Sequence, residues 1–451
     1  MDMIIKTPNE SLIRIKNDLI IKLILITFIL MPVLSGCKHK SPIIDQAGYQ
    51  TIYPIPDPQK KLIYFGSHSP FISDLKGNMS KYENCPLDGI SIKLPEEVGG
   101  GKIFMADQWK KVTEEAKQKV LQDITNIAES SVLTDNFIIL WAQRQMDWFS
   151  DEDWDALIDQ AKFVAKAAKL SKCKGFLWDP EAYPHNPNPW RYDTDEKRKE
   201  LTYQQFYNQV RKRGAQFMEA IQSEFPDVVI FSLREFSDFV HGSLYSQGIL
   251  PVLDTIDAKA TLENAWWSLH IPFTLGNLDV INPQATFIDG NEEAYFYTSA
   301  LEYYRIHDII KNDGKALVPP ELYSKFEKNY KMGHAISAGY ISGDWITLTP
   351  KFPYRLKAQA KMLTPEQRAL WFEHNTYYSL RTAYKYVWLF QGGDWWTGEK
   401  VPAGFSEALL SAKKKISNNE PLGFEVEDML KEAREKAKKY QLDNKIELEY
   451  R

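Results

Sequence analysis

Residues 175–184 read Gly-Phe-Leu-Trp-Asp-Pro-Glu-Ala-Tyr-Pro, a short apolar run that passes directly into a polar loop. A short apolar run bounded by turn residues predicts a buried strand. A long amphipathic segment follows at 203–224, and a second apolar run begins at 228. Strand, loop, helix and strand in this order form the repeating unit of a parallel sheet. The segment therefore predicts one βα unit of an α/β fold.

The same unit recurs along most of the chain, and eight runs are predicted as strands. They lie at 62–66, 89–94, 137–142, 175–179, 228–233, 286–289, 335–341 and 386–390. Helices are expected near 71–82, 107–129, 151–170, 203–224, 299–311, 365–383 and 405–416, with a long excursion between the fifth and sixth strands that ends near 283. Eight alternating units favour an α/β fold of the closed (β/α)8 TIM-barrel type with extended loops.

An open doubly wound sheet is the competing architecture. Such sheets usually carry a Gly-rich phosphate-binding turn after the first strand. Here that turn reads Gly66-Ser67-His68-Ser69-Pro70, which lacks the pattern. We therefore expect the barrel.

The bulk composition narrows the choice of partner. A barrel needs about 250 residues and tolerates insertions, so 451 residues suit one decorated domain. With 55 basic against 60 acidic residues the chain has no positive surplus, which argues against a nucleic-acid partner. Thirteen Trp and 23 Tyr provide flat faces of the kind that stack on sugar rings. A carbohydrate is therefore the expected partner, and no obligate protein partner is evident.

The N-terminus has the pattern of a targeting segment. An apolar run over 19–34 follows basic residues and ends in Leu34-Ser35-Gly36-Cys37, as a secretory signal does. The tetrapeptide resembles the bacterial lipobox, which implies lipidation at Cys37. A membrane-spanning anchor is the alternative, but the run is short and contains Pro32. We expect an exported lipoprotein on the periplasmic face or the outer surface of the outer membrane.

The remaining organisation follows from composition. Residues 1–37 are expected as the signal peptide with its lipidated Cys, and the polar, Pro-rich residues 38–60 as a linker. The barrel is expected over 61–420, and residues 421–451 as a solvated tail with a charged helix near 427–439.

The sharpest chemical signal is the acidic pair after the fourth strand. Active sites of barrels lie at the carboxyl ends of the strands. Asp179 and Glu181 are two residues apart, so on an extended backbone they project from the same side. Two close carboxylates raise one pKa, which leaves a protonated acid able to donate to a glycosidic oxygen. The alternative is an exposed acidic turn, since Asp-Pro and Tyr-Pro are common turn pairs.

A second acidic cluster follows the sixth strand. It contains Asp289, Gly290, Glu292 and Glu293. Ordinary glycosidases place two carboxyl groups on either side of the scissile bond. We therefore expect Glu292, or Asp289 in its place, to act as base or nucleophile opposite Glu181. The alternative is that the Glu pair begins a helix, where its charge suits the helix dipole.

Further candidates for substrate binding lie at or near other strand ends. An Arg beside a carboxylate orients a catalytic acid, binds an anionic sugar, or forms a structural ion pair. An Asp beside indoles predicts a sugar platform. The candidates are Tyr183, His68, Arg144, Arg234, Asp344, Trp345, Asp394, Trp395 and Trp396.

Other catalytic chemistries have no motif in the chain. The eight His residues show no His-x-His or His-Glu-x-x-His spacing, which argues against a metal site. No Gly-x-Ser-x-Gly elbow for serine chemistry occurs. We expect neither a metal nor a cofactor.

The Asp-x-Glu pair followed by Tyr-Pro resembles the signature of chitinase-type barrel hydrolases. The resemblance implies that Glu181 is the general acid and that Asp179 positions an acetamido group. That family has further Asp residues two and four positions before Asp179, where this chain has Leu177 and Gly175. Over residues 60–420 the chain resembles glycoside-hydrolase-like lipoproteins of gut and marine bacteria, which implies a hydrolase but no particular sugar.

Three functions therefore stand at this point. The leading hypothesis is a glycoside hydrolase that uses carboxylate acid/base catalysis. The alternatives are a chitinase-like, substrate-assisted hydrolase and a non-catalytic glycan-binding surface lipoprotein. Convergence of Asp179, Glu181 and Glu292 in space would favour an enzyme, whereas separate surfaces would favour the binding protein.

Overall fold

The computed structural model describes residues 59–104, 109–125, 130–142, 146–181, 188–239, 262–263, 265, 267–343 and 359–444. The proposed signal peptide, Cys37 and most of the linker lie outside these ranges. Tyr183, Arg144, Asp344 and Trp345 lie outside them as well. Tyr53–Arg451 forms one compact unit, and all elements named below belong to it.

Nine strands in the described part of the chain form a single parallel sheet. Their order in the sheet is β7-β6-β5-β4-β3-β2-β1-β9-β8. The strands are β1 (Lys61–Phe65), β2 (Gly89–Ile92), β3 (Phe137–Trp141), β4 (Gly175–Asp179), β5 (Val229–Ser232), β6 (Thr286–Asp289), β7 (Tyr330–Met332), β8 (His334–Ser337) and β9 (Tyr386–Phe390).

The two ends of this sheet are joined at one residue, Gly333. Strand β7 pairs with β6 and β8 pairs with β9, so one bent segment closes the sheet into a barrel with eight strand positions. The Gly333 N–H donates to the Asp289 carbonyl at 2.7 Å. A Cβ at Gly333 would lie 2.8 Å from the Phe231 ring, so only glycine fits the bend. The predicted (β/α)8 barrel is confirmed.

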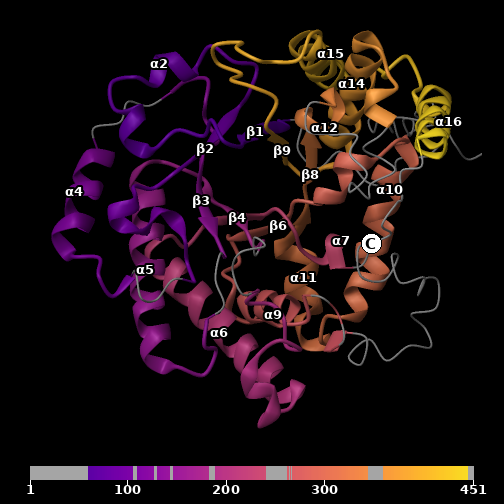
Figure 1. Cartoon of the computed structure of the whole chain (residues 1–451). Helices are drawn as coiled ribbons and strands as arrows, with labels where there is room; N and C mark the ends of the chain where they lie inside the picture. Colours follow the sequence, from indigo (N-terminus) through magenta and orange to yellow (C-terminus); the bar gives the residue numbers. More distant parts are fainter. Residues whose placement is uncertain are drawn as a thin grey trace, which may run out of the picture. The chain divides into compact units, whose positions relative to one another are not determined.

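Helices surround the strands, as Figure 1 shows. Several begin where the sequence supplies a cap: Ser150 caps α5, and Thr202 forms a capping box on α6. The longer helices are α4 (Glu114–Ile124), α5 (Asp151–Leu170), α6 (Tyr203–Glu224), α9 (His270–Val280), α10 (Ala300–Ile309), α11 (Tyr323–Asn329), α14 (Pro365–Thr382), α15 (Phe405–Asn418) and α16 (Glu427–Asp443). Short helical turns are η1 (Ile72–Leu75), α2 (Met79–Tyr82), η2 (Glu96–Gly101), η3 (Glu196–Lys199), α7 (Phe236–Asp238), η5 (Glu292–Phe296), η6 (Ile310–Gly314), η7 (Pro320–Leu322) and α12 (Ala338–Ser342).

Alternation along the strands divides the core into two layers. On β4, for example, Leu177 faces the barrel interior, whereas Phe176 and Trp178 pack against the surrounding helices. The interior is filled by side chains from successive strands, as in other barrels of this type. Its members are Ile63, Phe65, Phe137, Ile139, Leu177, Phe231, Leu233, Ile288, Tyr295, Ala335, Tyr386 and Trp388.

Two sequence expectations need correction. The predicted strand 335–341 is wrong in its second half, because α12 begins at Ala338 with the Ser337 hydroxyl accepting the Tyr340 N–H. The strand segment instead starts earlier, at Tyr330. The excursion before β6 contains α9, which was not predicted because it is apolar on every side and therefore shows no helical period.

The C-terminal helix α16 is longer than predicted and is not solvated on all sides. Leu430, Ala433 and Ala437 form a buried stripe at helical spacing. None of the helices in the described residues is long and apolar enough to cross a membrane.

Candidate active site

The end of β4 places one buried and one reachable carboxylate. Asp179 follows Leu177 by two residues, so it projects from the same side of the strand, and it has no exposed surface. Its Oδ1 accepts the Glu181 N–H at 2.9 Å. The Glu181 side chain remains 30% exposed. Asp179 therefore fixes the turn, and Glu181 is the member of the pair that a substrate can reach.

Arg234, just beyond β5, gathers three carboxylates. Its Nη1 donates to Glu181, and its Nη2 and Nε donate to the Asp238 Oδ1 at 2.9 and 3.2 Å. The Glu292 Oε2 lies 3.5 Å from the same Nε. The Trp267 ring packs against the guanidinium at 5.2 Å. An Arg engaged in this way orients carboxylates and has few donors left for an anionic sugar.

The structure thus brings together the acidic groups that follow β4 and β6. Glu181 and Glu292 contact different nitrogens of one planar guanidinium, so their contacting oxygens lie on the order of 8 Å apart or less. Glycosidases hold their two carboxyl groups about 5–5.5 Å apart for retention and about 6.5–9.5 Å apart for inversion. The arrangement is compatible with either spacing.

The surroundings of Glu292 strongly perturb its carboxyl group. Burial raises the pKa of Glu292 well above its usual range, and the charge of Glu181 raises it further, although Arg234 opposes both. The Glu292 side chain is nevertheless 19% exposed. A reachable carboxyl with a raised pKa is suited to donate a proton.

Asp289, the competitor of Glu292, points elsewhere. The neighbouring Ile288 faces the barrel interior, so Asp289 faces the outer layer and has no exposed surface. It accepts the Ser237 N–H at 2.8 Å, the Tyr330 hydroxyl at 2.6 Å and the Asn291 N–H at 3.0 Å. Asp289 therefore fastens the loops after β5 and β6 together.

A buried acid–imidazole pair lies next to Arg234 and was missed in the sequence. The Glu235 Oε1 is 3.4 Å from the His270 Nε2, and the Thr274 hydroxyl donates to the Glu235 Oε2 at 2.9 Å. Burial raises the pKa of Glu235 well above its usual range and lowers the pKa of His270 to about 3. His270 is therefore neutral at pH 7, and burial favours the protonated, uncharged form of Glu235. The only sequence signal was the acidic residue directly after Arg234.

Half-buried aromatic side chains stand at the same end of the barrel. Trp141 ends β3 and Phe390 ends β9, while Phe296 and Tyr340 follow β6 and β8. The Phe296 and Tyr340 rings lie 5.5 Å apart. Aromatic faces at the mouth of the barrel suit stacking on sugar rings. The signal that was missed is an aromatic residue at the last position of a strand.

The predicted indole platform is wrong. Trp395 and Trp396 are only 3% and 4% exposed. Trp395 stacks on Phe372 at 6.1 Å, and Trp396 meets Tyr64 edge-on at 5.1 Å. The loop after β9 turns both indoles into the outer core, so neither reaches a substrate.

The other described candidates have local roles. The Asp394 Oδ1 accepts the Trp396 and Thr397 N–H groups at 3.2 and 3.1 Å, which closes a turn. His68 is exposed, with its Nδ1 3.5 Å from the Tyr64 hydroxyl. Among the described residues, no group of three or more His, Cys, Asp or Glu side chains is arranged to hold a metal.

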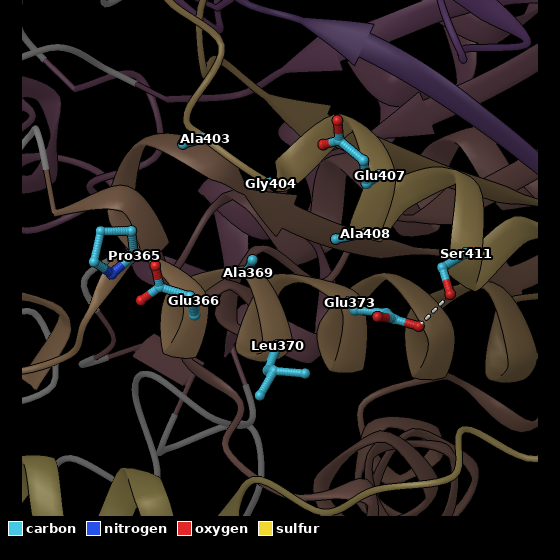
Figure 2. A pocket seen from close by; sticks show the side chains of 10 residues that line it. All are labelled: Pro365, Glu366, Ala369, Leu370, Glu373, Ala403, Gly404, Glu407, Ala408 and Ser411. Atoms are coloured by element: carbon cyan, nitrogen blue, oxygen red, sulfur yellow. Dashed lines mark hydrogen bonds between the residues drawn. The ribbon is translucent and has the colours of Figure 1, made fainter.

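A groove between α14 and α15 lies on the outer helical layer and contains none of the candidate residues. Figure 2 shows its lining, with Glu366 and Leu370 from α14 and Glu407 from α15. The candidate site is therefore the barrel mouth and not this groove.

Comparison with known proteins assigns the chain to no family. No known family profile and no curated protein matches the chain. Among solved structures, it is similar to a glycoside hydrolase family 5 enzyme from Prevotella bryantii B14 in complex with a xyloglucan tetradecasaccharide, with 11% identity and a TM-score of 0.32 over 84% of this chain and 92% of the other. The strand order and register establish the barrel independently of this likeness.

Proposed function

We propose that the protein is a glycoside hydrolase whose active site lies at the carboxyl ends of β4, β5 and β6. The observation that supports this most is the gathering of Glu181 and Glu292 on Arg234. The two carboxylates follow β4 and β6, the strands on either side of β5. Both are partly exposed, and their surroundings differ. Acid/base cleavage of a glycosidic bond requires one carboxyl group that donates a proton and a second that acts as a carboxylate, and different surroundings allow these two roles.

The environments favour Glu292 as the acid and Glu181 as the base or nucleophile. Burial holds the pKa of Glu292 high, which suits proton donation. Glu181 accepts a charge-assisted hydrogen bond from Arg234, the contact typical of an ionised carboxylate. These roles are the reverse of those expected from the sequence.

The proposed reaction follows from these positions. Glu292 transfers its proton to the glycosidic oxygen as the bond from that oxygen to the anomeric carbon breaks. Glu181 either attacks the anomeric carbon itself or removes a proton from an attacking water molecule. In both cases the leaving sugar departs as an alcohol. Where Glu181 attacks, the ionised Glu292 then removes a proton from a water molecule, which displaces Glu181 from the anomeric carbon, so either route consumes one water molecule for each bond cleaved.

The surroundings favour a general acid/base mechanism over a substrate-assisted one. Asp179 is buried and bonded to the Glu181 N–H, which suits a role in holding the turn. The half-buried aromatic residues at the mouth support binding of a glycan, and the engagement of Arg234 by three carboxylates supports a sugar without an acidic group near it.

We also propose that the protein is exported and lipidated at Cys37. The support is the apolar run that ends in Leu34-Ser35-Gly36-Cys37. Labelling of expressing cells with radioactive palmitate tests this: the wild-type chain is expected to carry label, and Cys37→Ala is not.

The decisive experiment compares Glu181→Gln and Glu292→Gln with the wild type on a panel of glycans and aryl glycosides. Glu407→Gln, on the outer groove of Figure 2, is the matched control. We expect each site variant to lose about 10²–10⁴-fold in kcat on natural glycans. Glu292→Gln alone is expected to keep activity on aryl glycosides, whose acidic leaving groups need no protonation.

Other outcomes have clear meanings. Retained activity of Glu181→Gln, but not of Glu292→Gln, on aryl glycosides would restore the roles expected from the sequence. A panel that is bound but never cleaved would make the protein a glycan-binding lipoprotein. Cleavage that survives both substitutions would exclude this pair as the catalytic groups.

A further inference from the structure

A buried line of hydrogen bonds connects α14 with the residue before Glu292. The Thr382 hydroxyl donates to the Tyr378 carbonyl at 2.7 Å. The same Thr382 oxygen lies 2.8 Å from the His334 Nε2, and the His334 Nδ1 lies 2.9 Å from the Asn291 Nδ2. Neither His334 nor Asn291 has any exposed surface. Each member therefore depends on its neighbours for hydrogen bonding.

The donors and acceptors of this line fix the tautomer of His334. Because the Thr382 proton goes to Tyr378, the Thr382 oxygen is an acceptor toward the imidazole. The His334 Nε2 must then carry the hydrogen, which leaves Nδ1 as an acceptor for the Asn291 amide. The ring is neutral, and only one of its two tautomers satisfies both neighbours.

The groups around the ring favour this neutral form. The facing titratable groups are Tyr303 and His307 on α10, whose rings lie 5.4 and 5.8 Å away, and Lys60 before β1. Burial, together with His307 and Lys60, lowers the pKa of His334 well below its usual range. An imidazolium would direct an N–H of Nδ1 at the Asn291 amide donor.

Asn291 needs this support because of its backbone. It adopts φ 45° and ψ 65°, in the left-handed region, and it is the residue from which η5 begins with Glu292. A non-glycine residue keeps such a conformation only where its surroundings impose it. Its N–H is held by Asp289 and its side chain by His334 and the Tyr297 hydroxyl. These contacts fix the backbone of Asn291, which directly precedes Glu292, and so set the direction in which the Glu292 side chain leaves the backbone.

We propose that His334 is a positioning residue, which acts through Asn291 to hold Glu292 in place for proton donation. This inference rests on the proposed function for its catalytic consequence. The hydrogen-bonded line itself does not depend on that function.

The test uses Thr382→Val, with Thr376→Val as the matched control. Both threonines are on α14 and donate to the carbonyl four residues earlier, Thr376 to Phe372 at 2.7 Å, but only Thr382 contacts His334. Valine keeps the volume and removes the acceptor. The full chain carrying Cys37→Ser serves as the parent for every measurement, and circular dichroism checks its folding.

Two spectroscopic readouts decide the proposal. Side-chain ¹⁵N NMR of the parent is expected to show a neutral His334 with hydrogen on Nε2. The ¹³C titration of the Glu292 carboxyl is expected to shift by about one pH unit or more in Thr382→Val and to remain at the parent midpoint in Thr376→Val. On a glycan that the parent cleaves, kcat of Thr382→Val is expected to fall about tenfold with KM unchanged.

A hydrogen on Nδ1, an imidazolium at neutral pH, or equal Glu292 titrations in the two variants would overturn the proposal. A parent that cleaves no glycan would instead defeat the proposed function. The two NMR readouts would still decide whether His334 positions Glu292.

Discussion

At the scale of single residues, Arg234 organises the mouth of the barrel. One guanidinium contacts Glu181, Asp238 and Glu292, and it rests on the Trp267 ring. Without it, three carboxylates would face one another with no described cation among them. The positive charge of Arg234 and the planar shape of its guanidinium contribute separately to holding the carboxylates. Only the planar shape lets one side chain hydrogen-bond several carboxylates at fixed angles.

Replacing Arg234 is expected to move the pH profile in a defined direction. Arg234 opposes the rise of the Glu292 pKa, so Arg234→Met should raise that pKa further. Because Glu292 must be protonated to act as the acid, the alkaline limb of kcat/KM should move to higher pH. Arg234→Lys keeps the charge and should lower kcat while moving the limb less. The pH dependence of kcat/KM measures this, and an unmoved limb in Arg234→Met would contradict the assignment of Glu292.

Glu235 is expected to make stability depend on pH. Its pKa in the folded protein lies above that of the unfolded chain, which is about 4.3. Its contribution is therefore complete below that value and is lost as the pH rises through the folded pKa. Glu235→Gln, which mimics the protonated carboxyl, should flatten the decline of Tm with rising pH. Equal slopes for Glu235→Gln and wild type would show that Glu235 is ionised in the fold.

The site residues differ in how far the sequence could reveal them. Glu181, Glu292 and Arg234 were found because each directly follows a strand of a predicted barrel. Asp289 was a weaker choice, since Ile288 faces the interior and alternation turns Asp289 outward. The contacts among Glu181, Arg234 and Glu292 could not be predicted, because they depend on side-chain directions across three loops.

At the scale of elements, α6 and α9 are packed backbone against backbone. A Cβ at Gly276 would lie 1.9 Å from the Arg211 carbonyl oxygen, and one at Gly214 would lie 2.1 Å from the Phe273 carbonyl oxygen. These two glycines let the helices approach more closely than any other residue would allow. The same two glycines also explain how α9, which has few polar side chains, packs closely against α6.

Gly276→Ala is therefore expected to destabilise the protein by about 1–3 kcal/mol, because the helices must separate to admit the methyl group. Gly314→Ala is the control, since its Cβ would meet only ordinary contacts at 3.5 Å or more and its φ is not positive. That variant should be neutral or slightly stabilising. Chemical denaturation measures both, and equal stability of the two variants would disprove the close contact.

Regular elements were predictable where one physical pattern dominated. Strands β4, β6 and β9 match their predicted bounds because short apolar runs end at turn residues. Helix α9 was not predictable, because burial on all sides removes the amphipathic period. The interruption of the seventh strand position at Gly333 could not be predicted either, because glycine is required there only by contacts with the neighbouring strands.

At the scale of the whole molecule, closure depends on segments that are distant in the sequence. The β1–β9 ladder pairs Lys61 with Tyr386, and Lys60 donates to the Ala383 carbonyl 323 residues away. Without β9, both β1 and β8 lose a neighbour and the sheet has open edges.

Two truncations are expected to separate closure from peripheral packing. A chain ending at Tyr384 lacks β9, α15 and α16 and should be digested rapidly by a dilute protease. A chain ending at Gly423 lacks only α16 and should stay folded with a lower Tm, because it loses the buried stripe of Leu430, Ala433 and Ala437. Limited proteolysis with circular dichroism measures both. Resistance of the shorter chain would show that the barrel persists without its last strand.

The pairing of the first strand with the last also determines when the sheet can close during biosynthesis. A ribosome releases β1 long before it adds β9, so during most of translation β1 has a neighbour on one side only. An unpaired strand edge attracts other chains, and nascent polypeptides of this kind depend on chaperones. The same delay leaves the barrel open until more than four-fifths of the 451 residues have been made, because β9 spans Tyr386–Phe390.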